Sequence, residues 1–439
     1  MKLFFKGANR SVLLVVCAFF GLHVPAQAED QAGPWCVGAL EALDQPQDTA
    51  AGIASQLLAL QTKPAIPESP RRLVFVSSSA AGPGDGSRAR PLKKLQVAVN
   101  RARPGDKIIV LPGNYEPVRI KNSGTADAPI IVAAENNASG RVVIDGTGKK
   151  DKSGKNVRGL IEIRDASYVT VSGFRLQNAP RDGIFVEGTT EGERGIRILD
   201  NDIDTTGNSA IFVAGIVMRF ITKVEEYRLF DVLVQGNRIT RTNEPKGVNE
   251  AISLGGGVDG FVIRNNYIFD TRQYGIDAKA GAINGSITDN VIHGIVRHGI
   301  YLDTGSRTVA HIDVRRNAVF GAKNGIVMAR ESDRDPEHPN LHNIQVEDNL
   351  VFDIAEFGIK AYRHPDDSGI GRFDEVRIAA NCVCGIKRDA IRLGGIGDFA
   401  KAFQVEDNLI LSSGGEVWNR IGADVRNNGQ SRGDLNCPS

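Results

Sequence analysis

The chain of 439 residues lacks several features that define common protein classes. After its first 28 residues, no apolar run is long enough to cross a bilayer, so we expect no membrane span. Basic and acidic residues nearly balance, with 53 against 52, and this does not favour nucleic acid as a partner. Hydrophobic residues make up 41% of the chain, which is enough for a large core.

Cysteine is also scarce, with five in the sequence. Four of them, Cys36, Cys382, Cys384 and Cys437, lie beyond the first 28 residues. An even set suits disulfide formation in an oxidising compartment, and the sequence leaves three pairings open. Zinc is the alternative, but Cys382 and Cys384 lack the spaced second pair or the histidines that a tetrahedral site usually has.

Residues 1–28 have the form of a secretory signal. Basic residues come first, an apolar stretch from Val12 to Val24 follows, and Ala26-Gln27-Ala28 is a small-x-small cleavage site. We therefore expect an exported protein, periplasmic or secreted, and we expect it to act as a monomer.

Residues 29–70 form an N-terminal lead-in segment with one weakly helical stretch around Ile53 to Leu60. We expect this segment to pack on the main domain or to stay partly mobile. The main domain covers residues 71–439, including a C-terminal tail. Near its start, the pattern predicts a helix over Pro91 to Ala102 that caps the N-terminal end of the domain.

A degenerate repeat begins beyond Asp106. One phase is an apolar strand that ends in asparagine, as in Ile196–Asn201 and Phe261–Asn266. From Asn266 onward, the asparagines follow one another after 24, 27, 32, 32 and 27 residues. A second phase opens with Gly-Ile or Ala-Ile, as in Gly275-Ile-Asp-Ala.

Two short strands in each repeat would let every coil lie about 4.8 Å from the previous one, with aliphatic side chains stacked inward. Asparagine suits the bends, because it tolerates left-handed backbone and its amide can bond to its neighbours in a ladder. Leucine-rich repeats have a similar period, but the leucine spacing that they need is absent. The sequence predicts an all-β, right-handed parallel β-helix of about ten coils with an N-terminal capping helix.

Three segments, Pro104–Tyr115, Gly124–Glu135 and Val142–Gly146, resemble the opening coils of pectate-lyase-like β-helix proteins. The likeness is greatest to the group of chondroitinase B, the related alginate lyases and the β-helical pectate lyases. It covers about Phe75 to Asn178 and continues as generic coils to about Leu411. The resemblance implies a β-helix that handles carbohydrate, since this group includes lyases, uronate epimerases, glycoside hydrolases and non-catalytic proteins.

Alternation along a strand predicts one outward polar column. In Gly275–Lys279, Ile276 and Ala278 should face inward, while Asp277 and Lys279 face outward. The same register predicts further members on the following coils: Tyr301, Asp303, Arg330, Lys360, Tyr362, Arg363 and Arg392. His298 lies at the edge of this face. On earlier coils, Phe185 and Phe212 are either sugar-stacking platforms or covered outer hydrophobes, and we favour the covered arrangement.

These residue types suit the cleavage of a uronate-containing polysaccharide by β-elimination. Arg330 could neutralise the uronate carboxylate, and Lys279, Lys360 or His298 could accept the C5 proton. Tyr301 could protonate the leaving oxygen. Substrate-binding candidates are Asp303, Tyr362, Arg363 and Arg392. The candidate calcium ligands are Glu250 and Asp303, and we expect no other cofactor.

Other functions stay open on the same face. A uronate C5-epimerase would share the proton abstraction, and a glycoside hydrolase would use Asp277 with Asp303. A non-catalytic periplasmic protein could use the column to bind or assemble polymer. Lys279 and Asp303 could also form a simple cross-strand ion pair. We favour an enzyme over a binding protein, because mixed titratable groups in one cluster tend to mark reactive sites.

Overall fold

The computed structural model describes residues 33–43, 49–63, 70–138, 140–188, 192–215, 229–245, 247, 249–305, 307–331, 340–363, 373–394, 402–411, 414–419, 424–426 and 428–430. The predicted signal over residues 1–28 and Cys437 lie outside these ranges.

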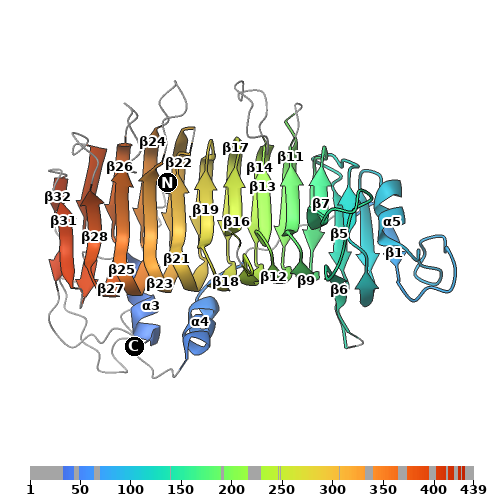
Figure 1. The fold of residues 1–439 in the computed structure, drawn as a ribbon, viewed down its shortest axis with the longest axis horizontal. Helices are drawn as coiled ribbons and strands as arrows, with labels where there is room; N and C mark the ends of the chain where they lie inside the picture. The colour runs from blue at the N-terminus through green and yellow to red at the C-terminus, as the bar shows by residue number, and fades with distance from the viewer. Residues whose placement is uncertain are drawn as a thin grey trace, which may run out of the picture.

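The described chain winds into a right-handed parallel β-helix whose coils lie side by side along the long axis (Figure 1). A coil has three strands, which form three faces. The 13 strands of the first face are β1 Arg72–Val76, β2 Asp106–Val110, β5 Ile130–Ala134, β8 Val169–Ser172, β11 Arg194–Leu199, β14 Leu229–Gln235, β17 Val258–Arg264, β20 Ile283–Thr288, β22 Val309–Arg315, β24 Leu341–Glu347, β26 Phe373–Ala379, β29 Phe403–Glu406 and β32 Asp424–Arg426.

The second and third faces follow in each coil. The second face holds β3 Gly113–Tyr115, β6 Val142–Asp145, β9 Arg175–Ala179, β12 Asp202–Thr206, β15 Arg238–Thr242, β18 Tyr267–Thr271, β27 Cys382–Ile386, β30 Leu409–Leu411 and β33 Gly429–Gln430. The third holds β4 Val118–Ile120, β7 Gly159–Arg164, β10 Asp182–Glu187, β13 Ile211–Ala214, β16 Glu250–Gly255, β19 Tyr274–Lys279, β28 Asp389–Gly394 and β31 Gly415–Asn419. Three long strands bend in the middle, so that each belongs to the second face and then to the third. They are β21 Val291–Asp303, β23 Ala318–Arg330 and β25 Leu350–Arg363.

The β-helix prediction is confirmed, but two details are corrected. The sequence predicts two strands in each repeat, whereas the structure adds a short strand directly after the asparagine, as in β18 after Asn266. The 13 strands of the first face also exceed the expected count of about ten coils. The sequence pattern does not reveal the short strand, because only a two-residue bend separates it from the strand before it.

The inside of the coil is a stack of aliphatic side chains. On the third face, one isoleucine from each of six successive strands lies directly over the next and is fully buried: Ile252, Ile276, Ile300, Ile326, Ile359 and Ile391. Each such burial stabilises the fold by about 1.5–3 kcal/mol. Because these isoleucines stack in register, the outward residues that follow them on successive strands are aligned with one another as well.

An asparagine ladder runs along the bend between the first and second faces. The amide of Asn290, for example, donates to Oδ1 of Asn317 at 2.9 Å, and Asn317 donates to Asn349 at 3.0 Å. The left-handed backbone occurs one residue earlier, with φ of 56° at Asp289 and 52° at Arg316. The predicted ladder is therefore present, but these asparagines do not adopt the strained conformation themselves.

Helix α5, Leu95–Arg101, packs Leu95, Ala98 and Val99 against the core at the N-terminal end of the coil (Figure 1). It confirms the predicted cap, although it begins four residues later than Pro91. Burying these apolar side chains shields the end of the core from solvent.

Two further helices, α3 Pro34–Leu43 and α4 Ala50–Ala59, pack on the outer surface of the second face (Figure 1). Leu57 lies in the same apolar cluster as Phe320 and Phe352. A disulfide joins Cys36 to Cys382, 346 residues later. Of the three pairing schemes that the sequence leaves open, this bond selects the one that contains it. Cys384 is disulfide-bonded as well. Among the described helices, none has the length and apolar character needed to span a membrane.

Candidate functional site

The third face carries the polar column where the register predicts it. Asp277 on β19 pairs in register with Tyr301 on β21, and Lys360 on β25 pairs with Arg392 on β28. Val327 lies between Tyr301 and Lys360 in the same row. In the adjacent row, the order is Lys279, Asp303, Ala329 and Tyr362. The predicted residues therefore share one side of the molecule.

Part of the predicted outward column is closed to solvent. The exposed fraction is 1% for Asp277, 2% for Tyr301, 3% for Asp303 and 0% for Arg330. Large outward side chains on neighbouring coils cover one another, because the coils are only about 4.8 Å apart. Lys279, Lys360, Tyr362, His298 and Arg392 keep partial exposure.

Lys279 lies at the centre of an acidic cluster. Its Nζ is 2.5 Å from Glu250 Oε1 on the preceding coil and 2.9 Å from Asp277 Oδ2. Burial alone would lower the pKa of Lys279, but the charges of Asp277 and Glu250 outweigh it and raise that pKa. The amine therefore stays protonated, which contradicts its predicted role as a base. The simple ion-pair alternative expects Asp303 to be the partner of Lys279. The structure instead places Nζ of Lys279 closest to Glu250 and Asp277.

The carboxyl groups beside Lys279 titrate unusually. Burial, followed by the charge of Glu331, raises the pKa of Asp303 to about 7. Burial also raises the pKa of Asp277, and the nearby Asp303 adds to this effect. Two buried carboxyl groups on adjacent coils cannot both ionise easily, so one tends to hold a proton near neutral pH.

The predicted calcium ligands, Glu250 and Asp303, lie on this same cluster. The ammonium group of Lys279 contacts Glu250 directly and already supplies a positive charge there. In the described part of the chain, no group of three or more His, Cys, Asp or Glu side chains is arranged to hold a metal ion. Calcium binding at Glu250 and Asp303 stays a prediction.

An aromatic cluster adjoins the acidic one. The hydroxyl of Tyr301 donates to Glu331 and lies 3.3 Å from the hydroxyl of Tyr362, and the ring of Tyr274 is 5.1 Å away. Burial raises the pKa of Tyr301 and of Tyr362, so both phenols stay protonated. Tyr301 is almost fully buried and already donates its proton to Glu331, so its predicted role as a proton donor stays a prediction, and Tyr362 is the phenol with more solvent access.

His298 is held neutral. Burial, together with the positive charge of Lys360, lowers its pKa to about 3. Oδ1 of Asn324 accepts from the backbone of Phe357, so its amide nitrogen faces Nδ1 of His298 at 3.2 Å. This contact uses the lone pair of Nδ1 and leaves the proton on Nε2. In this state His298 is a hydrogen-bond donor rather than the predicted base.

Lys360 and its neighbours form the accessible part of the column. Nζ of Lys360 lies 4.2 Å from the ring centre of Tyr362 and 5.1 Å from that of Phe357. Burial lowers the pKa of Lys360, and the charge of Arg392 lowers it further. Arg392 is held by Asp389 at 2.7 Å. Of the two lysines predicted as bases, Lys360 is the one whose pKa is lowered and whose surroundings leave it partly exposed.

Arg330 and Arg363 occupy paired positions at the ends of β23 and β25. Arg330 is fully buried, so the predicted direct contact with a substrate carboxylate is not available in this arrangement. Arg363 stays partly exposed. The burial of Arg330 was not evident from the sequence because it depends on packing between coils.

A third row of the face was missed by sequence reasoning. Tyr274, His298, Asn324 and Phe357 occupy equivalent positions on four successive coils. Each directly precedes the glycine that opens the second repeat phase, so the same rule that found His298 could have found the others. Glu331 was missed because it follows the end of its strand.

Phe185 and Phe212 stack with ring centres 5.6 Å apart, and Phe185 is 1% exposed. The guanidinium groups of Arg158 and Arg164 lie 4.4 and 4.7 Å from the centre of Phe185. The favoured covered arrangement is confirmed for Phe185, with arginines among the covering groups. We also expect the segment from Met218 to Phe230 to cover these rings, but residues 218–228 lie outside the described ranges.

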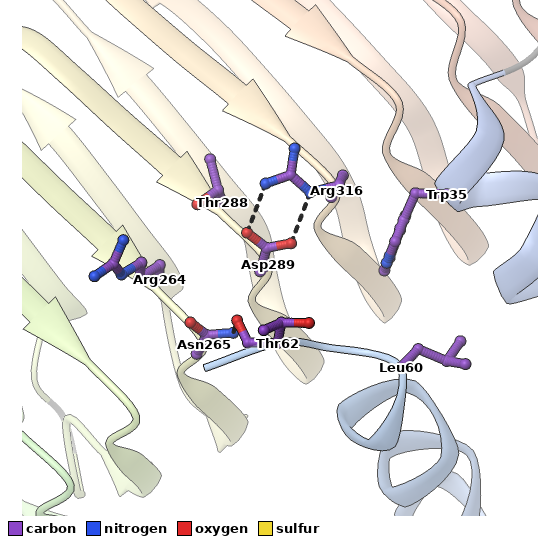
Figure 2. Close-up of a pocket in the computed structure, with 8 residues that line it drawn as sticks. All are labelled: Trp35, Leu60, Thr62, Arg264, Asn265, Thr288, Asp289 and Arg316. Atoms are coloured by element: carbon purple, nitrogen blue, oxygen red, sulfur yellow. Dashed lines mark hydrogen bonds and ion pairs between the residues drawn. The ribbon is translucent and has the colours of Figure 1, made fainter. Parts of the chain in front are cut away.

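The hollow in Figure 2 lies away from the polar column, between the end of α4 and the asparagine bend. Asp289 and Arg316 form a two-contact ion pair in it, with both distances 2.8 Å, and Trp35 lines the other side. A second hollow on the first face is lined by Asp231, His311 and neighbouring residues. Neither hollow includes a residue of the polar column.

Comparison with known proteins places this architecture in a family. The sequence model described as "Right handed beta helix region" matches residues 159–372, and the model for chondroitinase B matches residues 90–173. A pectate lyase, PEL9 from Emericella nidulans, is 33% identical over 117 residues. These matches support a pectate-lyase-like superfamily of right-handed parallel β-helices.

Two further proteins match over longer stretches. The uncharacterised protein YwoF of Bacillus subtilis is 26% identical over 336 residues, which are 69% of this chain. The chain spans 65% of the length of YwoF and 28% of that of PEL9. The structure of XylC with xylose superposes with a TM-score of 0.53 and 14% identity, covering 78% of this chain and 75% of that one. This last likeness concerns the fold.

Proposed function

We propose that this superfamily member is an exported enzyme that cleaves a uronate-containing polysaccharide by β-elimination at Lys360, Tyr362 and Arg392. The observation that carries the proposal is the position of these three groups. They lie on two adjacent coils of one face, each partly exposed, with a lowered pKa at Lys360 and a raised pKa at Tyr362.

Each group has a defined task. Arg392 pairs with the uronate carboxylate and makes the C5 proton more acidic. Lys360, in its neutral form, takes that proton. The electron pair forms the C4–C5 double bond as the C4–O bond breaks, and the leaving oxygen takes a proton from Tyr362. The lysine then returns its proton to the tyrosinate through water.

The neighbouring rows would position the sugar. His298 presents Nε2–H beside the same face and can donate to a sugar oxygen. The similarity to a protein named as a pectate lyase is consistent with this chemistry. The predicted signal over residues 1–28 fits an enzyme that meets polymer outside the cytoplasm.

A hydrolase is the second candidate, because one specific feature favours it. Asp277 and Asp303 lie on adjacent coils, and the pKa of each is raised. Such a pair could supply one carboxylic acid and one carboxylate, as glycoside hydrolysis needs. The burial of both carboxyl groups makes this the weaker proposal.

The test is an activity screen on polygalacturonate, alginate and chondroitin. Elimination should produce the ultraviolet absorbance of an unsaturated uronate, and the rate should fall at least about a hundredfold in Lys360→Met and Tyr362→Phe. Lys152→Met and Tyr168→Phe, which lie outside the column, serve as controls. New reducing ends without absorbance would replace the lyase proposal with the hydrolase. Exchange of the C5 proton with solvent in an intact chain would instead identify an epimerase, and polymer binding without reaction would refute catalysis.

A further inference from the structure

The hollow in Figure 2 lies where the helices α3 and α4 meet the asparagine bend at separate coils. Near the start of α3, the backbone N–H of Cys36 donates to Oδ1 of Asp348 at 3.0 Å. Beyond the end of α4, the side-chain amide of Asn265 donates to the carbonyl oxygen of Thr62 at 3.5 Å. The coils between these two contacts form the floor of the hollow.

The hollow has an apolar side and a polar side. Trp35 and Leu60 line it from the helices, and Leu60 is 44% exposed. Arg264, Asn265 and Thr288 line it from the coil. Its volume is about 330 Å³. Sites for small molecules have volumes of about 300–1,000 Å³, so this hollow is large enough for one small ligand.

Two buried polar atoms of the lining residues lack hydrogen-bond partners in the described part of the chain. One is the acceptor Oδ1 of Asn265, although only 8% of this residue is exposed. The other is a donor, the indole Nε1 of Trp35. Buried donors and acceptors without partners are unfavourable, so a ligand that can both donate and accept would be stabilised here.

Arg264 adds an oriented donor beside the hollow. Its Nε donates to Oε1 of Gln235 at 2.7 Å, and only 2% of Gln235 is exposed. Because a guanidinium group is planar, this hydrogen bond sets the direction of the terminal N–H groups of Arg264. These groups can donate to a neutral oxygen as well as to an anion.

The other charges around the hollow favour an uncharged ligand. Both oxygens of Asp289 accept from Arg316, each at 2.8 Å, so these two side chains neutralise one another (Figure 2). The carboxylate of Asp289 and the amide oxygen of Asn265 are both acceptors. An anionic group cannot donate to either of them, whereas a hydroxyl group can.

We propose that this hollow is an accessory binding site for a single uncharged sugar ring. The hydroxyl groups of a pyranose both donate and accept, and its C–H face packs on an indole ring such as that of Trp35. One hydroxyl donates to Oδ1 of Asn265, and Arg264 with Thr288 binds the others. The proposal does not depend on the lyase activity proposed above, because no residue of the polar column lines the hollow.

Fluorescence titration tests the proposal. The sequence has two tryptophans, Trp35 and Trp418, so Trp418→Phe leaves Trp35 as the only indole. In this variant, at least one of galactose, glucose and mannose should change the emission of Trp35 to saturation. The uronate of that sugar should bind at least about tenfold more weakly, because its carboxylate would lie near Asp289. Calorimetric titration of the wild type should give the same order of affinities without a substitution.

Two variants test the contacts with little risk to the fold. Asn265 has a φ of 55°, which glycine adopts freely, so Asn265→Gly removes the amide and keeps the bend. Thr288→Val removes a hydroxyl within a strand, where valine is favourable. Each should weaken sugar binding at least about fivefold. The matched control is Asn284→Gly, which also has a φ of 55° but does not line the hollow, and it should bind as the wild type does.

Several results would overturn the proposal. One is the absence of a saturable signal with all three neutral sugars. Others are equal affinity for a sugar and its uronate, or equal affinities of Asn265→Gly and Asn284→Gly. Lys360→Met should bind the neutral sugar normally, and loss of binding in this variant would place the sugar on the third face instead. Normal sugar binding by a protein that cleaves no polymer would support the accessory site while the proposed lyase activity fails.

Discussion

The ammonium group of Lys279 lies 2.5 Å from the carboxylate of Glu250, one coil away, and holds the acidic cluster of the third face together. Asp277 and Asp303 complete that cluster and are almost fully buried. A lysine in this position balances charge inside the protein, which separates its role from that of the more accessible Lys360.

Lys279→Met should therefore destabilise the protein by about 3–5 kcal/mol, because it leaves buried carboxylates without their cation. The loss of unfolding free energy in Lys279→Met should be larger at pH 8 than at pH 5, since more of the buried carboxyl groups are charged at the higher pH. Urea denaturation at both pH values measures it. Lys152→Met, at an exposed site, should change nothing, and equal stability of wild type and Lys279→Met would contradict the structural role.

The lowered pKa of His298 makes folding sensitive to acid. The folded protein binds this proton only near pH 3, whereas the unfolded chain binds it near pH 6.5. Between these values the unfolded state holds more protons, so the contribution of His298 to stability is lost as the pH falls. His298→Gln should reduce the loss of unfolding free energy between pH 6.5 and 4, relative to wild type. His311→Gln, on the first face, is the control, and parallel pH profiles for wild type and His298→Gln would disprove the linkage.

Asn317 occupies a central rung of the asparagine ladder. Its amide nitrogen donates to Ile287 O at 2.8 Å and to Asn349 Oδ1 at 3.0 Å, and its Oδ1 accepts from the amide nitrogen of Asn290. Asn317→Ala should cost about 2–4 kcal/mol, because buried donors and acceptors on both sides lose their partners. Thermal unfolding should show a smaller effect for Asn428→Ala at the last described rung. A neutral Asn317→Ala would mean that the ladder is dispensable.

The disulfide between Cys36 and Cys382 fixes α3 and α4 to the second face. Replacing both cysteines by serine should lower stability by about 2–4 kcal/mol. The helices should also become more susceptible to limited proteolysis, while the coil persists. Wild type treated with reductant loses this disulfide together with the one at Cys384, so its helices should be at least as susceptible as those of the variant. Unchanged cleavage of residues 33–63 would show that the apolar contacts of Leu57 and its neighbours suffice.

The register of the third face was available from the sequence, because it depends on local alternation. Gly275-Ile-Asp-Ala-Lys279 and Gly299-Ile-Tyr-Leu-Asp303 each show which residues face inward, and stacking their isoleucines aligns Asp277 with Tyr301. The ladder was visible in the same way, since its asparagines recur at nearly regular intervals. The short strand of the second face was less visible, because it continues the preceding strand after two residues.

The roles within the column could not be derived in this way. Lys279 and Lys360 both face outward on the third face, yet the charges of Asp277 and Glu250 raise the pKa of Lys279, whereas burial and the charge of Arg392 lower that of Lys360. The burial of Tyr301 and Arg330 likewise depends on side chains from other coils. The sequence by itself determined which residues stack into one face, because strand alternation and coil repeat are local properties. Only the tertiary structure decided their protonation and access, because both depend on the dielectric surroundings and on charges brought together from distant parts of the chain.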